Sequence, residues 1–256
     1  MTDLDETLHL RQARIDELHR LRPGRTALVV IDMQHGFLDP GAALEVPQGR
    51  EIVPNVRRLV DACRRKQVPV VFTEFVYASS VPCLRGDPFG VEHLPAKPGE
   101  PTGFGHPSNN CLIGPDIGKG DKSNLPERPE GGFAQSGPVS FSRESPNSAQ
   151  TIAELAPRPD ELVVQGHTYD KFYGTPLDLA LRSRDVRWLM VTGVVTDVCV
   201  NATLMSAASR DYRVTAVTDG VATLWPEIQA ACFEVWKRKF ARLRTTAQLV
   251  DELEAF

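Results

Sequence analysis

The chain lacks the features that mark several large classes of protein. In its 256 residues no apolar run approaches the ~20 residues that a membrane-spanning helix needs. The formal net charge of −4 leaves no excess of positive charge for binding nucleic acid or an anionic membrane. Residues 1–11 are charged and do not form the apolar core of a signal peptide, so a cytoplasmic location is expected.

Cysteine is also scarce, and its distribution excludes two kinds of small scaffold. The five cysteines are an odd number, are widely spaced and include no Cys-x-x-Cys pair. This pattern argues against a disulfide framework and against a zinc ribbon. The cysteines are Cys63, Cys83, Cys111, Cys199 and Cys232.

Strand-like apolar segments alternate with helix-like segments along most of the chain. The expected strands are residues 26–32, 68–73, 161–164, 188–192 and 213–217. The expected helices are residues 4–21, 52–66, 149–155, 176–184, 198–209, 227–242 and 246–255. Such alternation predicts an α/β fold, a three-layer sandwich whose mostly parallel sheet carries helices on both faces.

We expect a single domain over residues 1–256, with two additions to the sandwich. Residues 1–23 are expected to form an exposed helical extension that packs on a partner subunit. Residues 79–147 are rich in Pro, Gly, Ser and Asn and show no sustained hydrophobic period. Irregular segments of this length are usually functional lids or disordered, and the scattered aromatic and aliphatic residues favour an ordered, lid-like insertion.

The most informative position is Cys199, which follows the expected strand 188–192. Gly193 breaks that strand, and Thr196 or Asp197 is placed to cap a helix beginning near Val198. A thiol in the first turn of a helix lies near unsatisfied backbone N–H groups and the positive end of the helix dipole, which favour the nucleophilic thiolate. The alternative is a small buried side chain, because free cysteine is among the most buried residue types.

Two more polar features follow expected strands. Asp32 ends the apolar run Val29-Val-Ile-Asp32, where a carboxylate is costly unless it is paired or used; its other role would be to cap a turn. The segment 165–178 follows the strand that precedes the cysteine strand. In a doubly wound sheet, ligands bind at the carboxyl ends of strands. An acid and a thiol at neighbouring strand ends suggest a base and a nucleophile.

Three segments together resemble the isochorismatase-like cysteine hydrolases. They are Ala27-Leu-Val-Val-Ile-Asp-Met-Gln34, Phe172-Tyr-Gly-Thr-Pro-Leu-Asp178 with the helix after it, and Val191-Thr-Gly-Val-Val-Thr-Asp-Val-Cys-Val200. Within that family the chain is nearer the amidohydrolases of N-carbamoyl and ureido compounds than the nicotinamidases. Nicotinamidases carry an Asp-x-His metal site after the second strand, whereas this chain has Thr73-Glu-Phe-Val-Tyr-Ala78. The resemblance therefore implies no catalytic metal, and we expect no cofactor.

The resemblance also implies roles for particular residues. Cys199 would be the nucleophile and Asp32 the base that takes its proton. The backbone N–H groups of Val195 and Cys199 would form the oxyanion hole, and the Val194–Val195 peptide bond would be cis. The reaction would cleave the C–N bond of a small amide, carbamoyl or ureido substrate through a thioester, in a homo-oligomer that binds neither nucleic acid nor membrane.

One position departs from the family pattern. The family has a catalytic lysine six residues before the Phe of its Lys-x-x-Tyr-Ser/Asp-x-Phe motif, and counting back from Phe172 places Gly166 there. Three explanations remain open: Lys171 supplies the cation from a different position, another group supplies it, or the amidase activity is lost or altered. The other groups considered are His167 and the insertion lysines Lys97, Lys119 and Lys122.

Position in the expected fold suggests a substrate pocket. His35, Phe37 and Tyr77 follow the ends of the first two strands, and His167 and Tyr169 follow the third. Two functions compete with the amidohydrolase. One is an altered or inactive family member that binds a small ligand. The other is a hydrolase of a non-amide bond, as in vinyl-ether cleavage by the isochorismatases proper, which need no cysteine.

Overall fold

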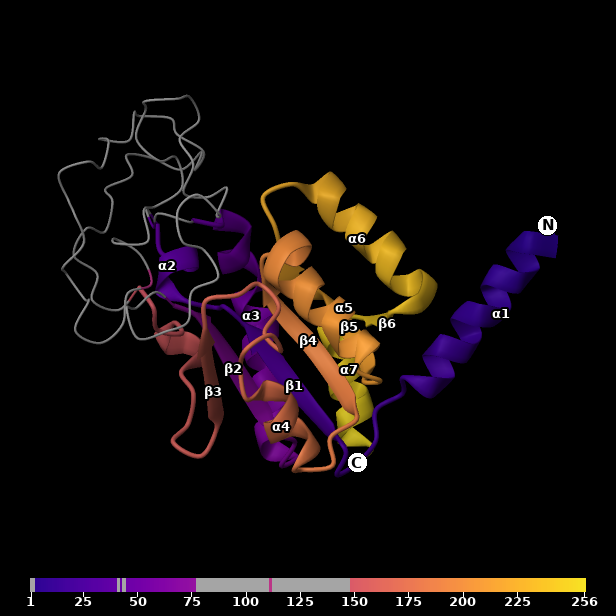
Figure 1. Cartoon of the computed structure of the whole chain (residues 1–256), viewed down its shortest axis with the longest axis horizontal. Coiled ribbons are helices and arrows are strands. Elements are labelled where there is room, and N and C mark those ends of the chain that lie inside the picture. Colours follow the sequence, from indigo (N-terminus) through magenta and orange to yellow (C-terminus); the bar gives the residue numbers. More distant parts are fainter. Residues whose placement is uncertain (1–2, 41, 43–44, 77–110, 112–147) are drawn as a thin grey trace.

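The computed structural model describes residues 3–40, 42, 45–76, 111 and 148–256 (Figure 1). Nearly all of the predicted lid-like insertion, residues 79–147, therefore lies outside the described residues. In chain order the elements are α1 (Asp3–Leu18), β1 (Thr26–Ile31), α2 (His35–Leu38), α3 (Pro47–Arg65), β2 (Val70–Phe75), the 3₁₀ turn η4 (Ala153–Leu155), β3 (Leu162–Gly166), α4 (Leu177–Arg182), β4 (Trp188–Val194), the π-helical turn η5 (Thr196–Val200), α5 (Asn201–Ser209), β5 (Arg213–Ala222), α6 (Pro226–Lys239), β6 (Ala241–Arg244) and α7 (Thr246–Glu254).

The described strands form one six-stranded sheet in the order β3-β2-β1-β4-β5-β6, and neighbouring strands are parallel. The central strand β1 is buried at all six positions. A strand inside a parallel sheet packs against helices on both faces. The sequence of β1 is therefore a continuous apolar run and not an alternating one.

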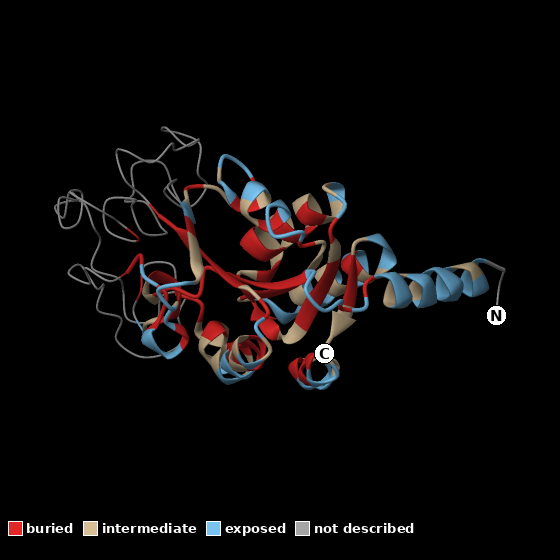
Figure 2. Ribbon diagram, turned by 90° about the horizontal axis from the view of Figure 1, so that it is seen from below, coloured by how far each residue is buried: buried red, intermediate tan, exposed pale blue. Residues whose placement is uncertain are grey.

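Two apolar clusters cover the two faces of the sheet (Figures 1 and 2). One cluster joins β1 and β2 to α2, α3, η4 and α7, with Val56, Leu59 and Leu249 fully buried in it. The other joins β1, β4 and β5 to α4, α5 and α6, with Leu204 and Trp236 at its centre. The predicted three-layer α/β sandwich with a parallel sheet is confirmed.

The strand order brings the ends of β1 and β4 together in the middle of the sheet. From β1 the chain adds β2 and β3 on one side, and it then returns across the sheet to add β4 on the other side of β1. The crevice at such a reversal, outside the carboxyl ends of the strands, is where open parallel sheets bind ligands. Asp32 follows β1 and Cys199 lies in η5 directly after β4, so both residues belong to this crevice.

The structure also corrects several element predictions. Residues 149–155 contain only the short turn η4, and the predicted helix 227–242 ends at Lys239 and is followed by the strand β6. Helix α3 begins at Pro47, five residues earlier than expected, with proline in its first turn. Helix α1 extends from the body with most of its surface exposed, including Leu4 and Leu10 (Figure 2).

Gly193 permits the close approach of β4 to β1 just before the crevice. Its φ of +121° lies in a region that side chains rarely adopt, and a Cβ atom added there would lie 2.0 Å from the Ile31 carbonyl oxygen. Ile31 is also its register partner on β1, one residue before Asp32. Any side chain at position 193 would therefore push β1 and its terminal carboxylate away from β4.

We expect Gly193→Ala to lower the free energy of unfolding by roughly 3–5 kcal/mol, because it combines unfavourable backbone geometry with a backbone clash. Urea denaturation measures the effect. Gly24→Ala is the matched control: Gly24 also has positive φ (+71°), but its added Cβ would meet nothing within 4 Å. The control should lose only about 1–2 kcal/mol. Equal losses in the two variants would show that the close approach at Ile31 is unimportant.

Candidate active site

Asp32 is fully buried and is held by the neighbouring strand. Its backbone N–H donates to the Thr73 carbonyl at 3.1 Å, which continues the pairing of β1 with β2 for one residue. The Thr73 hydroxyl donates to Asp32 Oδ1 at 2.8 Å. Asp32 itself has a φ of 51°, so the chain turns at this residue and leaves the strand. These contacts fix the carboxylate at the mouth of the crevice with Oδ2 available to a second partner.

That partner is Lys171. Its ammonium nitrogen lies 2.7 Å from Asp32 Oδ2, and both side chains are at most 2% exposed. The same nitrogen donates to the Thr168 carbonyl at 3.0 Å and lies 5.1 Å from the centre of the Phe75 ring. Two charges removed from water are tolerated when they are closely paired and further hydrogen bonded, as they are here. Of the cations that the sequence suggested, Lys171 is the one that the described residues bring onto Asp32.

The Cys199 thiol completes this buried group. It is 4% exposed and hydrogen bonds to the Asp32 carboxylate. Burial raises the pKa of Cys199 well above that of an exposed thiol. The Asp32 carboxylate raises it further, through its negative charge and by accepting a hydrogen bond from the thiol. The Lys171 ammonium and a backbone hydrogen bond from Val195 oppose this and lower the pKa. Burial outweighs the favourable contacts, so the surroundings do not favour the expected thiolate.

The helix after β4 begins differently from the prediction. Val195 precedes η5 and provides no side-chain cap, and neither Thr196 nor Asp197 caps the helix. The Thr196 hydroxyl donates to Gln229 of α6 at 3.0 Å, and the Asp197 carboxylate accepts from Thr223 at 2.5 Å. Both side chains are recruited by elements distant in sequence. They anchor the Cys199 turn to the rest of the fold.

The Val194–Val195 peptide bond is cis, as the resemblance implied. It lies immediately before the π-helical turn, whose Val198 and Val200 N–H groups donate to the Val195 carbonyl at 3.1 and 3.2 Å. These bonds close the backbone from Val195 to Val200 into a tight turn, and Val195 also hydrogen bonds to the Cys199 sulfur. The oxyanion hole at the Val195 and Cys199 N–H groups stays a prediction.

Phe75 is the centre of an aromatic group next to the ion pair. The ring of His167 lies 4.8 Å from it, that of Tyr169 is stacked at 6.1 Å, and that of Phe37 meets it edge-on at 6.4 Å. Phe37 and His167 are buried, and the His167 Nδ1 is 3.2 Å from the Val76 carbonyl. These predicted pocket residues thus form one apolar wall against Lys171.

The other two predicted pocket residues have different outcomes. His35 is half-buried and pairs with Asp39 at 2.9 Å within α2, so its Nδ1 is engaged away from Asp32. Tyr77 lies outside the described residues, as do Lys97, Lys119 and Lys122.

Several residues that contact this group were not predicted from sequence. Thr73 and Thr168 hold the ion pair, and Gln34 bonds Phe75 through both its amide oxygen and its amide nitrogen, at 2.7 and 2.9 Å. Gln34 also approaches the buried Cys111 sulfur at 3.8 Å. The signal for Thr73 was its place two residues before the end of β2, beside the end of β1. For Gln34 and Cys111 no sequence signal pointed to these partners.

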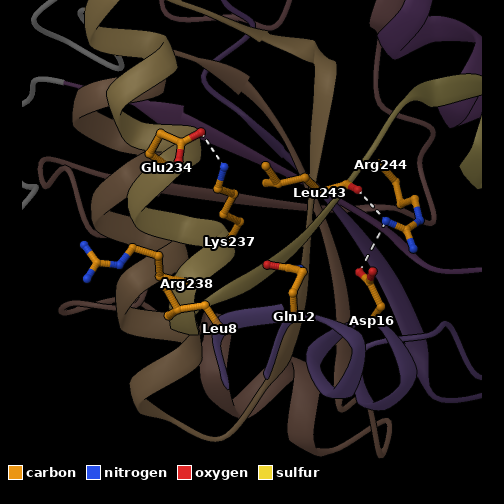
Figure 3. A pocket seen from close by; sticks show the side chains of 8 residues that line it. All are labelled: Leu8, Gln12, Asp16, Glu234, Lys237, Arg238, Leu243 and Arg244. Carbon is orange, nitrogen blue, oxygen red and sulfur yellow. Dashed lines mark hydrogen bonds and ion pairs between the residues drawn. The ribbon is translucent and has the colours of Figure 1, made fainter. Parts of the chain in front are cut away.

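The described residues contain no group of three or more His, Cys, Asp or Glu side chains suited to a metal ion. Among the same residues, no helix is long and apolar enough to cross a bilayer. A groove of about 700 Å³ lies between α1, α6 and β6, where Lys237 pairs with Glu234 and Arg244 with Asp16 (Figure 3). The predicted site residues do not line this groove.

The chain is similar to known proteins in sequence and in fold. The model of the isochorismatase domain family matches residues 26–248. The chain is 30% identical over 225 residues to ureidoacrylate amidohydrolase RutB of Pseudomonas syringae pv. syringae (strain B728a), a match that covers 84% of this chain and 79% of that protein.

Two solved structures show the same fold. A cysteine hydrolase from Pseudomonas syringae pv. phaseolicola 1448A superposes with a TM-score of 0.64 at 25% identity, covering 92% of this chain and 95% of the other. N-carbamoylsarcosine amidase from Thermoplasma acidophilum has a TM-score of 0.56 at 22% identity over 87% of this chain and 96% of its own. At that identity the second likeness concerns the fold alone.

The Asp32–Lys171 pair is testable by a double-mutant cycle. Each single change, Lys171→Met or Asp32→Asn, leaves one buried charge without its partner and should cost about 3–5 kcal/mol of unfolding free energy. The double variant removes both charges and should be much more stable than the sum of the single losses predicts. Urea denaturation of the four proteins measures this. Strictly additive losses would show that the two side chains do not interact in solution.

Proposed function

Because the chain belongs to the isochorismatase family and its 30%-identical relative is an amidohydrolase, we propose that it is a cysteine-dependent hydrolase of the C–N bond in a small amide, carbamoyl or ureido compound. The observation that carries the proposal is the contiguous buried group of Asp32, Lys171 and Cys199 in the crevice between β1 and β4. It joins a nucleophile, a base and a fixed cation at the place where this fold binds ligands.

In the first step the Cys199 sulfur attacks the substrate carbonyl carbon while Asp32 takes the thiol proton. The hydrogen bond from thiol to carboxylate already defines the path of that proton. Because burial raises the pKa of Cys199 and disfavours a free thiolate, we expect the proton to pass to Asp32 as the sulfur attacks. The Lys171 ammonium remains beside the developing negative charge and stabilises it.

The tetrahedral oxyanion is then held by the backbone N–H groups of Val195 and Cys199. Its collapse breaks the C–N bond, and protonated Asp32 returns the proton to the departing nitrogen, so that ammonia or an amine leaves and a thioester remains. A water molecule deprotonated by Asp32 attacks the thioester carbonyl. This releases a carboxylic or carbamic acid and returns the proton to the sulfur.

A ureido compound is the substrate class to test first, since the relative that is 30% identical is a ureidoacrylate amidohydrolase. The apolar wall of Phe75 and Tyr169 beside Lys171 would exclude water from the reacting carbonyl and strengthen the electrostatic effect of the ammonium.

We expect the wild-type protein to release ammonia from ureidoacrylate or N-carbamoylsarcosine, and Cys199→Ala to lower kcat by at least ~10³-fold, because the nucleophile is removed. A coupled ammonia assay measures turnover. Rapid acid quenching followed by mass spectrometry of the intact protein should show an acyl adduct that Cys199→Ala lacks. Cys232→Ala is the thiol control and should remain active, because Cys232 lies on α6 away from Asp32.

Ammonia release that survives undiminished in Cys199→Ala would exclude covalent catalysis. Ligand binding without turnover, measured by calorimetry on both compounds, would instead identify an inactive, binding member of the family.

The unusual position of the lysine provides a second test. Gly166 ends β3, where its register partner is Phe75, and a Cβ atom there would lie 3.1 Å from the Thr175 methyl group. A side chain at this position thus needs only a small shift of one methyl. It would leave the sheet on the same face as Val164, which belongs to the cluster that contains Cys199.

Lys171→Ala should lower kcat/KM by roughly 100-fold or more, since a fixed charge that stabilises the transition state is lost. The double variant Gly166→Lys, Lys171→Ala should regain at least ~10-fold of this, because the ammonium is restored to the same crevice. Gly166→Met, Lys171→Ala supplies a chain of similar length without charge. If both double variants have equal kcat/KM, the cation is not the missing element.

A further inference from the structure

Lys171 lies in a loop, Thr168–Phe172, that is braced by its own polar groups. The Thr168 hydroxyl donates to the Asp170 carbonyl at 2.7 Å, and the Asp170 carboxylate accepts from the Phe172 N–H at 2.9 Å. The Thr175 hydroxyl donates to the Lys171 carbonyl. These bonds shape the loop, but they do not fix where it sits relative to Cys199.

A row of polar side chains on the helix after Cys199 makes that connection. The Thr203 hydroxyl accepts from the Lys171 N–H at 3.1 Å and donates to the Tyr169 carbonyl at 3.2 Å. The Ser206 hydroxyl donates to the Asp170 carboxylate at 2.7 Å. Each contact joins one residue of α5 to one or two residues of the lysine loop.

The spacing of these side chains puts them on the face of the helix that bears the thiol. Thr203 is four positions after Cys199 and Ser206 is three after Thr203, the intervals at which helical residues are neighbours. Arg210, four positions further, places its guanidinium 5.1 Å from the centre of the Phe172 ring. The helix α5, which continues directly from the turn that carries Cys199, therefore holds the loop that carries Lys171.

Thr203 differs from an ordinary buried threonine in a helix. Such a hydroxyl usually bonds to a carbonyl of its own helix, whereas both Thr203 bonds given above leave the helix for the lysine loop. Thr203 and Lys171 are each 1% exposed and Tyr169 is half-buried, so the Lys171 N–H has no water as a ready substitute for the hydroxyl that it shares with the Tyr169 carbonyl. A valine would fill the same volume and leave both groups without this partner.

We propose that Thr203 is a positioning residue for the reaction: it locks the Lys171 backbone to the helix of Cys199 and so sets the ammonium on Asp32. The proposal rests on the proposed function, in which that ammonium stabilises charge next to the thiol. A lysine side chain has four rotatable bonds and so gains its precision from a fixed backbone. A displacement near 1 Å at a catalytic group costs up to ~10²-fold in rate.

The test compares Thr203→Val, Thr203→Ser and a matched control, Thr26→Val. Thr26 is equally buried and its hydroxyl plays the same double role, accepting from the Arg22 N–H at 3.0 Å and donating to the Arg22 carbonyl at 2.8 Å. It lies at the opposite end of β1 from Asp32. Thr26→Val therefore reports the structural cost of losing two buried hydrogen bonds away from the crevice.

With ureidoacrylate as substrate, we expect Thr203→Val to lower kcat by ~10–100-fold with little change in KM. Thr203→Ser keeps the hydroxyl and should stay within ~3-fold of wild type, and Thr26→Val should lose stability but not kcat. Urea denaturation of all three variants shows whether they fold. Equal kcat in Thr203→Val and Thr26→Val would overturn the proposal.

Alkylation by iodoacetamide supplies a readout that does not need turnover. The rate at Cys199, followed by peptide mass spectrometry from pH 6 to 10, reports how readily its thiol ionises. Lys171→Met should move the profile to higher pH, since the cation that lowers the pKa of Cys199 is gone. Thr203→Val should move it in the same direction, and Thr203→Ser should not.

The two proposals fail in different ways. An unchanged profile in Lys171→Met would overturn the role of the lysine and with it the proposed mechanism. A shifted profile in Lys171→Met beside an unchanged one in Thr203→Val would overturn the positioning role alone.

Discussion

The buried ion pair between Asp32 and Lys171 is the constraint on which the crevice depends. A carboxylate at the end of a central strand is shielded from water on every side, so it persists only with a partner and hydrogen bonds. Thr73 supplies one bond and Lys171 the counter-charge. Burial raises the pKa of the thiol beside them, and the same carboxylate that pairs with the lysine accepts a hydrogen bond from that thiol. The side chains of Asp32, Lys171 and Cys199 thus satisfy one another's buried polar groups and also form the proposed site.

The sheet reaches this arrangement through three loops that meet at one edge. β1 brings Asp32, the turn after β4 brings Cys199, and the loop after β3 brings Lys171. Because β3 is two strands away from β1, its loop has to cross over β2, and the long lysine side chain spans the remaining distance. The hydrogen bonds from α5 to that loop connect Lys171, whose strand lies farthest from β1 of the three, to the helix that follows Cys199.

Much of the fold was predictable from the sequence because the buried strands of a parallel sheet are continuous apolar runs. The runs at 26–32 and 188–192 identified β1 and β4, but Gly193 does not end β4 as expected: the strand continues to Val194, with Gly193 in register with Ile31. The short strand β6, Ala-Arg-Leu-Arg, was missed because its sequence has too few apolar positions to separate it from the helix before it.

The capping prediction at Thr196 and Asp197 failed because these side chains hydrogen bond to distant elements, α6 and the segment after β5. Local patterns do not record such competition. The same holds for Lys171, whose pairing depends on how a loop folds back and not on its count from Phe172.

The sequence position of Lys171 shows how a charged group can keep its location in a site while the residue that carries it changes. The resemblance places Gly166 at the family's lysine position, whereas the ammonium that reaches Asp32 in this chain is borne five positions later, on Lys171. A search that required a lysine at that one position would reject the chain, although the family model as a whole matches residues 26–248. Long, flexible side chains allow a charge to change its point of attachment while its location in space is preserved, provided that the receiving backbone is anchored. A charged group on such a side chain can therefore move to another position in the sequence and still reach the same place. A short side chain such as that of Cys199 or Asp32 has to stay at the position where its backbone places it.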